Sequence, residues 1–206
     1  MNYIIDLPGS RPLTGPGNWP DLRLDFRMLK LRKTAAGEPL LLAMTAVRMA
    51  DRLLVIGCAE ARLVAQLATK PGLSGRACAV DETADRTARA AAAAVKEGAL
   101  LEVETAPVTM LPYDTESFDV VVVSHLLPEL AEERRLAALR EAARVLRAGG
   151  RCVVVQAARR AGLAGLFASA HMPASAVEAV LQAAGFRAVR TLAERQGLVF
   201  VEGARR

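Results

Sequence analysis

From residue 51 onward, short apolar runs alternate with longer segments rich in helix-forming residues. Because the runs are apolar at consecutive positions, they are typical of strands in a parallel sheet that is covered on both faces. We predict strands at Leu53–Cys58, Arg76–Val80, Leu100–Glu104, Val120–Ser124 and Cys152–Gln156. We predict helices between them at Ala61–Ala68, Thr83–Glu97 and Ala131–Arg147. This alternation of strand and helix predicts a doubly wound α/β domain.

The C-terminal part of the chain departs from this alternation. A helix is expected at Ala174–Ala184, and strand-like runs follow at Arg187–Leu192 and Leu198–Glu202. The few residues between these two runs cannot form a parallel crossover, which needs about a dozen residues or more. They therefore predict an antiparallel hairpin at the end of a seven-stranded, mostly parallel sheet.

Charged residues mark both ends of the helix expected at Ala131–Arg147. Glu132 and Glu133 lie in its first turn and Arg144 and Arg147 in its last turn, an order that the helix dipole favours. Gly149 follows just past the expected end of the helix. We predict that this glycine caps the helix.

The first part of the chain forms a separate segment. Residues 1–20 are dense in proline and glycine and predict an extended arm, whereas Asp21–Lys33 and Glu38–Ala50 have helical spacing. We divide the chain into an N-terminal arm and helix at residues 1–33 and an α/β domain at residues 34–206. Trp19, the only tryptophan, either packs the arm against the core or belongs to a lid over a site.

Composition narrows the class of protein. The chain has 27 Lys+Arg against 22 Asp+Glu, and aromatic residues make up only 4% of it. Because the basic residues are spread along the chain and aromatic residues are few, nucleic-acid binding is disfavoured. The three cysteines are far apart and within or next to apolar runs, as expected of buried thiols in a cytoplasmic protein. No apolar run approaches the about 20 residues that span a membrane.

Ligands of open α/β sheets bind beyond the carboxyl ends of the strands, where the strand order reverses. The segments that follow the first, second and fourth expected strands are Gly57-Cys58-Ala59-Glu60-Ala61, Asp81-Glu82 and Ser124-His125. Asp81 lies one helix and one strand after the glycine turn, where an acid accepts the hydroxyl groups of a ribose in dinucleotide-binding folds. An aspartate after a strand also commonly caps the next helix, so both interpretations stay open.

Three motifs in combination resemble a known family. They are Leu53-Leu54-Val55-Ile56-Gly57-Cys58-Ala59-Glu60-Ala61 with Asp81 downstream, Leu111-Pro112-Tyr113-Asp114-Thr115-Glu116-Ser117-Phe118-Asp119-Val120-Val121, and Arg144-Val145-Leu146-Arg147-Ala148-Gly149-Gly150. Over roughly residues 38–202 the chain resembles the class I S-adenosylmethionine-dependent methyltransferases, in particular the small type 11 or ubiquinone-biosynthesis-like group. The resemblance implies a Rossmann-like fold with S-adenosylmethionine as cofactor. It implies cofactor contacts from Gly57, Cys58, Ala59, Glu60, Asp81, Glu82, Val108 and Ser124.

The cofactor motifs depart from the family pattern at Val55, Ala59, Ala61 and Pro107. Val55 replaces an acid that normally helps to hold the methionine ammonium group, and Pro107 lies where the family has an acid for the adenine amino group. We hypothesise that Glu60 supplies the missing charge and that the backbone N–H of Val108 reaches the adenine ring. Two alanines replace loop glycines, at a cost only if those positions need a positive φ.

His125 follows the fourth expected strand, next to where the family places the transferable methyl group. A neutral imidazole there can accept a proton from an attacking hydroxyl or amine. The alternative is a ring that packs or caps the next helix. In the same family the segment before the first strand commonly lies above the carboxyl ends of the strands, which favours a lid at residues 1–33.

The leading functional hypothesis is S-adenosylmethionine-dependent methyl transfer to a small-molecule acceptor. The lost loop residues motivate the alternative, a catalytically inactive methyltransferase-like domain that acts as a binding or assembly partner. A nicotinamide-dependent reductase is disfavoured because the chain has no Gly-x-Gly-x-x-Gly turn after its first strand.

Overall fold

The computed structural model describes residues 38–158 and 171–206. The chain divides into two units, residues 1–33 and 34–206, and the described residues belong to the second unit. The predicted arm with Trp19 and the helix predicted at Asp21–Lys33 lie outside the described residues.

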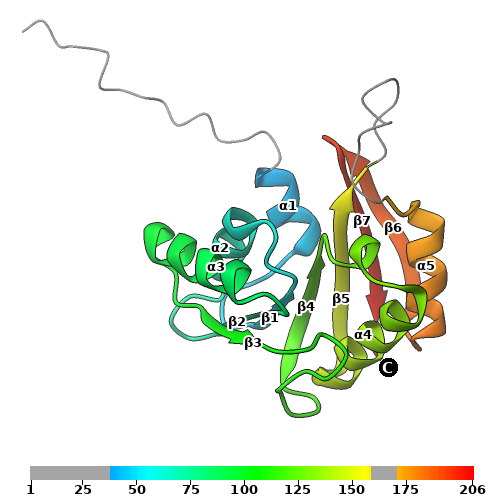
Figure 1. The fold of residues 1–206 in the computed structure, drawn as a ribbon, viewed down its shortest axis with the longest axis horizontal. Helices are drawn as coiled ribbons and strands as arrows, with labels where there is room; N and C mark the ends of the chain where they lie inside the picture. The colour runs from blue at the N-terminus through cyan, green and yellow to red at the C-terminus, as the bar shows by residue number, and fades with distance from the viewer. Residues whose placement is uncertain (1–37, 159–170) are drawn as a thin grey trace, which may run out of the picture. The chain divides into compact units, whose positions relative to one another are not determined.

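The described strands form one seven-stranded sheet in the order β3-β2-β1-β4-β5-β7-β6 (Figure 1). The strands are β1 Arg52–Ile56, β2 Arg76–Asp81, β3 Glu102–Thr105, β4 Phe118–Ser124, β5 Leu146–Ala157, β6 Arg187–Arg195 and β7 Leu198–Ala204. Strands β1 to β5 pair in parallel, whereas β7 is antiparallel to both β5 and β6. The prediction of a mostly parallel sheet with a C-terminal antiparallel hairpin is confirmed.

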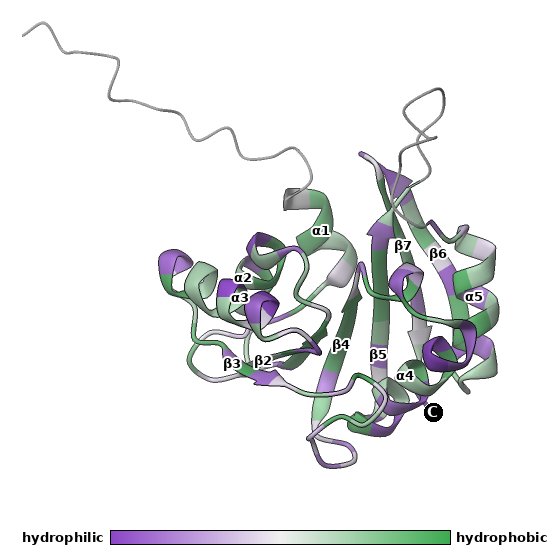
Figure 2. Ribbon diagram, in the orientation of Figure 1, coloured by the Kyte–Doolittle hydropathy of each residue, from purple (hydrophilic) through white to green (hydrophobic). Residues whose placement is uncertain are grey.

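Helices cover both faces of this sheet. They are α1 Glu38–Thr45, α2 Ala61–Ala68, α3 Ala84–Glu97, the short 3-10 helix η2 Leu127–Glu129, α4 Glu132–Val145 and α5 Ala174–Ala183. Helices α1, α2 and α3 pack in one hydrophobic cluster with Leu53 and Val55, whereas α4 and α5 pack in another with Leu54 and Ile56. Alternate residues of a strand point to opposite faces, so burial on both faces explains the unbroken apolar runs. Figure 2 shows this apolar character along β4 and β5.

The predicted end of the helix at Ala131–Arg147 is wrong. Helix α4 ends at Val145, and Leu146 is already extended and begins β5. Leu146 is fully buried and pairs with Phe118 of β4, so packing favours the strand over another helical turn. Gly149 does not cap the helix; its N–H donates to the carbonyl oxygen of Arg205 at 3.0 Å.

The helix predicted at Glu38–Ala50 is shorter than expected, because α1 ends at Thr45. Ala46 adopts a left-handed φ of 45° and turns the chain out of the helix. Ala50 then donates its N–H to the carbonyl oxygen of Pro71 at 2.9 Å. This tertiary hydrogen bond replaces the one that a continued helix would have made.

Candidate functional site

The strand order reverses at β1, which lies between β2 and β4. The backbone turn that leaves β1 depends on Gly57, whose φ is +95°. A Cβ added at this position would lie 2.4 Å from the carbonyl oxygen of Ser124 at the end of β4. Real Cβ atoms do not approach an oxygen so closely, so only glycine lets the end of β1 pass this close to β4.

The two alanines in the loop cause no left-handed strain. Neither Ala59 nor Ala61 has a positive φ, and Ala61 is the first residue of α2. The loss of glycine at these positions therefore carries no backbone penalty of the kind that a left-handed conformation would impose.

Asp81 ends β2 and connects the glycine turn to the start of α3. Its carboxylate accepts the backbone N–H of Cys58 on Oδ2 at 2.7 Å and that of Thr83 on Oδ1 at 2.9 Å. The side chain is only 3% exposed. The helix-capping interpretation is not met, because Thr83 is the N-cap residue of α3 and Asp81 accepts the N–H of Thr83 itself, one residue before the helix begins. A carboxylate has about four lone-pair positions, so Asp81 keeps acceptor capacity for a further donor.

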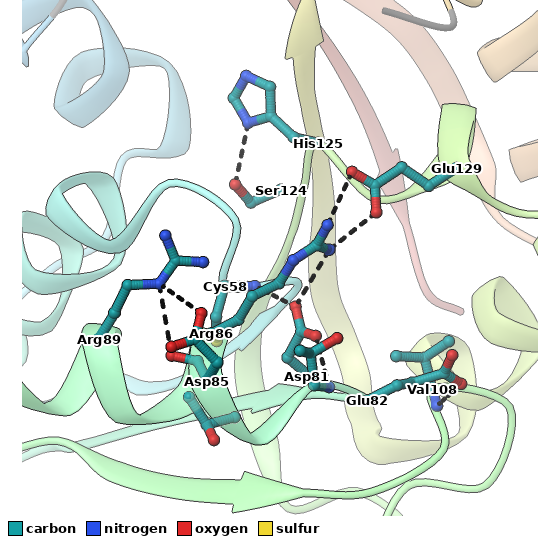
Figure 3. Close-up of polar contacts among 12 residues, drawn as sticks. Cys58, Asp81, Glu82, Asp85, Arg86, Arg89, Val108, Ser124, His125 and Glu129 are labelled. Atoms are coloured by element: carbon teal, nitrogen blue, oxygen red, sulfur yellow. Dashed lines mark hydrogen bonds and ion pairs between the residues drawn. The ribbon is translucent and has the colours of Figure 1, made fainter.

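Arg86 and Glu129 lie beside Asp81, and nothing in their sequence spacing predicted this. Arg86 Nη1 lies 2.8 Å from Glu129 Oε2 and 3.8 Å from Asp81 Oδ2 (Figure 3). Its other terminal nitrogen, Nη2, lies 3.3 Å from Glu129 Oε1. The chain brings a buried carboxylate, a guanidinium and a partly exposed carboxylate together at this edge of the sheet.

Glu82 and Val108, both predicted cofactor contacts, contact each other. Glu82 Oε1 accepts the backbone N–H of Val108 at 3.1 Å and also lies 2.5 Å from Arg134 Nη2. The side chain of Val108 is fully buried. The amide that was predicted to reach an adenine ring therefore has an acceptor within the protein.

His125 adopts a left-handed φ of 53° directly after β4. Its backbone N–H donates to the carbonyl oxygen of Val155 at 2.8 Å, and its ring Nδ1 lies 3.2 Å from the hydroxyl oxygen of the buried Ser124 (Figure 3). Burial lowers the pKa of His125 below 6.5, although the charges of Glu60 and Glu129 act in the opposite direction. The imidazole is therefore neutral at neutral pH. Non-glycine residues held in left-handed conformations concentrate at functional sites.

The remaining predicted contacts differ in exposure. Glu60 is exposed and precedes α2 without making a side-chain cap hydrogen bond, so its carboxylate faces solvent at the helix start. Cys58 is fully buried, and burial together with the nearby Asp81 raises the pKa of its thiol to about 12. The backbone N–H of Cys58, rather than its sulfur, takes part in the site.

Comparison with known proteins agrees with this architecture. Residues 54–154 match the model of a family described as "Methyltransferase domain". The chain contains a class I methyltransferase domain. A comparison with curated protein sequences finds no match. The narrower resemblance to the ubiquinone-biosynthesis-like group stays a prediction.

Solved structures share the fold of the methyltransferase domain. An S-adenosylmethionine-dependent methyltransferase from Aquifex aeolicus has a TM-score of 0.72 at 19% identity, over 86% of this chain and 96% of that chain. The S-adenosylmethionine-dependent methyltransferase SibL has a TM-score of 0.67 at 24% identity, over 82% of this chain and 54% of that chain. The cyclase SpnF has a TM-score of 0.65 at 18% identity, over 82% and 79% of the two chains. Because a cyclase shares the fold, these similarities show architecture alone.

S-adenosylmethionine is the cofactor of this family. The residues present fit its ribose, because Asp81 is a carboxylate with spare acceptor capacity at the switch point of the sheet. The fit to the methionine part of the cofactor is less direct. Val55, which stands where the family has an acid, is fully buried in an apolar cluster, so the exposed Glu60 is the acid of this turn that could pair with the ammonium group. Within the part of the chain that the structure describes, no helix is long and apolar enough to cross a membrane.

Proposed function

We propose that this protein transfers a methyl group from S-adenosylmethionine to a small-molecule acceptor. The observation that carries the proposal is the placement of Asp81, whose buried carboxylate is held by the turn after β1 and by the start of α3. This arrangement presents a charged acceptor to the two hydroxyl groups of a ribose, a contact that is stronger than a neutral hydrogen bond.

The chain's own residues have few chemical tasks in such a reaction. When bound, S-adenosylmethionine supplies an electrophilic methyl group on its sulfonium sulfur. The displacement is in line, so most of the rate comes from holding the acceptor and the methyl group in alignment. Asp81 and the Gly57 turn bind the cofactor, and His125 takes up the proton that the acceptor loses.

We propose that His125 accepts this proton on Nε2. A free lone pair on Nε2 requires the other ring nitrogen to carry the hydrogen, and Nδ1–H then donates to the Ser124 hydroxyl oxygen at the observed 3.2 Å. Ser124 would thus select the tautomer that can act as a base. The lowered pKa of His125 supports the same role, because the ring is neutral and ready to accept a proton at neutral pH.

A small acceptor agrees with the connections around the site. Strand β5 ends at Ala157 and α5 begins at Ala174. A link of this length is too short for an inserted substrate-binding domain, since domains have about 50 residues or more. The three cysteines are free and buried, which supports the further proposal that the protein works in the reducing cytoplasm.

Calorimetric titration with S-adenosylmethionine and S-adenosylhomocysteine tests the proposal. Asp81→Ala is expected to weaken binding by about 1.5–3 kcal/mol, or roughly 10- to 150-fold, through loss of a charge-assisted pair of hydrogen bonds. Asp85→Asn is the matched control, because Asp85 is an exposed acid in the first turn of α3 that pairs only with Arg89 among its described contacts. Melting curves show whether each variant is folded.

The titrations distinguish cofactor binding by the protein from the specific role of Asp81. No heat with the parent protein at millimolar ligand would overturn cofactor binding and favour the inactive binding domain. Equal affinity of the parent and Asp81→Ala would overturn only the role of Asp81.

A further inference from the structure

Arg86 lies between two carboxylates and forms an ion pair with each, but it is hydrogen-bonded only to Glu129. Both of its terminal nitrogens engage Glu129, at 2.8 Å and 3.3 Å. The nitrogen nearer to Asp81 stops 3.8 Å from Oδ2, beyond hydrogen-bond distance. A small movement of the guanidinium would convert this approach into a direct hydrogen bond.

The buried carboxylate is the stronger attractor of the two. The Asp81 side chain is almost fully buried, whereas that of Glu129 is 45% exposed. Attraction between opposite charges is greater where water is excluded. Without its contact to Glu129, the Arg86 guanidinium would therefore move to Asp81. The bidentate contact with Glu129 opposes this movement.

We infer that Glu129 is a positioning residue that holds Arg86 away from Asp81 and so keeps the Asp81 carboxylate available to a ligand diol. This inference rests on the proposed function, since it gives a consequence only if Asp81 binds the cofactor ribose. Arg86 in direct contact with Asp81 would occupy an acceptor position and compete with the hydroxyl groups. Glu129 lies in η2, the short helix after β4, whereas Asp81 is the last residue of β2. A residue after β4 thus controls the approach of Arg86 to Asp81.

Four variants test this inference by calorimetry with S-adenosylhomocysteine. Glu129→Gln, which keeps the shape but loses the charge, is expected to weaken binding by about tenfold because Arg86 moves to Asp81. Arg86→Met removes the competing donor and is expected to bind within about threefold of the parent. The double variant is expected to regain the affinity of Arg86→Met. Asp85→Asn is the control, because it breaks the exposed Asp85–Arg89 pair on the same helix.

Recovery of affinity in the double variant is the decisive result. A merely structural role of Glu129 predicts that the double variant binds as weakly as Glu129→Gln or more weakly, and that result would overturn the inference. A direct contact between Glu129 and the ligand predicts the same lack of recovery.

A crystal structure of Glu129→Gln without ligand adds a measurement that does not depend on binding. Arg86 is expected within hydrogen-bond distance of Asp81, and an Arg86 side chain that stays away from Asp81 overturns the inference. If the parent binds the ligand and Glu129→Gln binds it with the same affinity, only the inference about Glu129 is overturned. No binding by the parent overturns the ribose role of Asp81 and this inference with it.

Discussion

Gly57 shows how one backbone position can set the geometry of a whole site. Its φ of +95° is unfavourable for any residue with a side chain, and a Cβ would meet the backbone of β4 at 2.4 Å. The obstacle is a carbonyl oxygen in the sheet rather than a flexible side chain, so it cannot move aside. The turn that supplies the Cys58 N–H to Asp81 therefore depends on this glycine.

We predict that Gly57→Ala lowers the free energy of unfolding by about 2–4 kcal/mol, from the left-handed φ and the steric overlap together. Gly98→Ala is the control, because Gly98 has a φ of +68° but a Cβ added there would meet no atom within 4 Å. It is expected to cost only about 1–2 kcal/mol for the φ alone. Urea denaturation measures both values. Equal losses in the two variants would show that β4 relaxes around the new methyl group.

His125 predicts a pH dependence whose sign follows from its lowered pKa. Below the folded-state pKa the ring is charged and cannot accept a proton, so the methyl-transfer rate should fall as the pH drops through this lowered pKa, which lies below the ordinary value of 6.5. The unfolded chain takes up the proton first, so stability also falls as the pH decreases from 6.5 to the lower folded-state pKa, and this contribution is constant below it.

His125→Asn should remove both effects, because asparagine tolerates the left-handed φ but has no titratable ring. The expected measurement is a pH profile of the methyl-transfer rate from pH 5 to 8 for the parent and the variant, with a loss of about 10²–10⁴-fold in rate for the variant at neutral pH. A variant with the parent's rate and profile would assign the ring to packing.

The start of α2 illustrates what an element contributes as a unit. The first backbone N–H groups of a helix favour negative charge, and Glu60 lies directly before this helix without capping it. Its carboxylate is therefore available to a cation. Val55→Asp cannot restore the acid of the family, because Val55 is fully buried in an apolar cluster and an unpaired carboxylate there would be strongly destabilising.

We predict that Glu60→Gln weakens binding of S-adenosylhomocysteine by about 3- to 10-fold, through loss of an ion pair with the ligand's ammonium group. The control is a change of ligand. 5′-Methylthioadenosine has the same nucleoside but lacks the ammonium group, so its affinity should be the same for the parent and the variant. Calorimetry gives both constants. An equal loss for the two ligands would mean that Glu60 acts on the loop and not on the ammonium group.

Elements were predictable where burial alone decides the conformation. The unbroken apolar runs of β1, β2, β4 and β5 identified the parallel sheet, and the short link before β7 identified the hairpin. The end of α4 was not predictable from its charges and Gly149, because the pairing of Leu146 with β4 decides it. The end of α1 at Thr45 was not predictable either, because it coincides with a left-handed Ala46 and is followed by the hydrogen bond from Ala50 to Pro71.

In the site, the residues placed by the strand ends were predictable, whereas the contacts between distant side chains were not. Gly57 and Asp81 lie together because parallel strands bring their carboxyl ends to one edge. The contact of Arg86 with Glu129 joins residues far apart in the chain and depends on how α3 and η2 are oriented over the sheet. The contact of Glu82 with the Val108 N–H likewise depends on the path of the loop after β3. Local pattern carries no signal for either of them.

At the scale of the whole chain, residues 1–33 form a unit separate from residues 34–206. We propose, from its sequence and its position before the first strand, that this segment closes over the methyl-transfer site. A lid would exclude water from the reacting groups and become ordered when ligand binds. An arm that serves packing alone would be equally protected in both states.

Trp19, the only tryptophan of the chain, makes this prediction measurable in the intact protein. Addition of S-adenosylhomocysteine should shift the tryptophan emission to shorter wavelength and slow amide hydrogen exchange in residues 1–33, because a closing lid removes this segment from water. Calorimetry on the same sample shows that the ligand is bound. If exchange in residues 1–33 is then unchanged, and deletion of residues 1–20 lowers the melting temperature without altering affinity or turnover, the segment contributes packing and does not act as a lid.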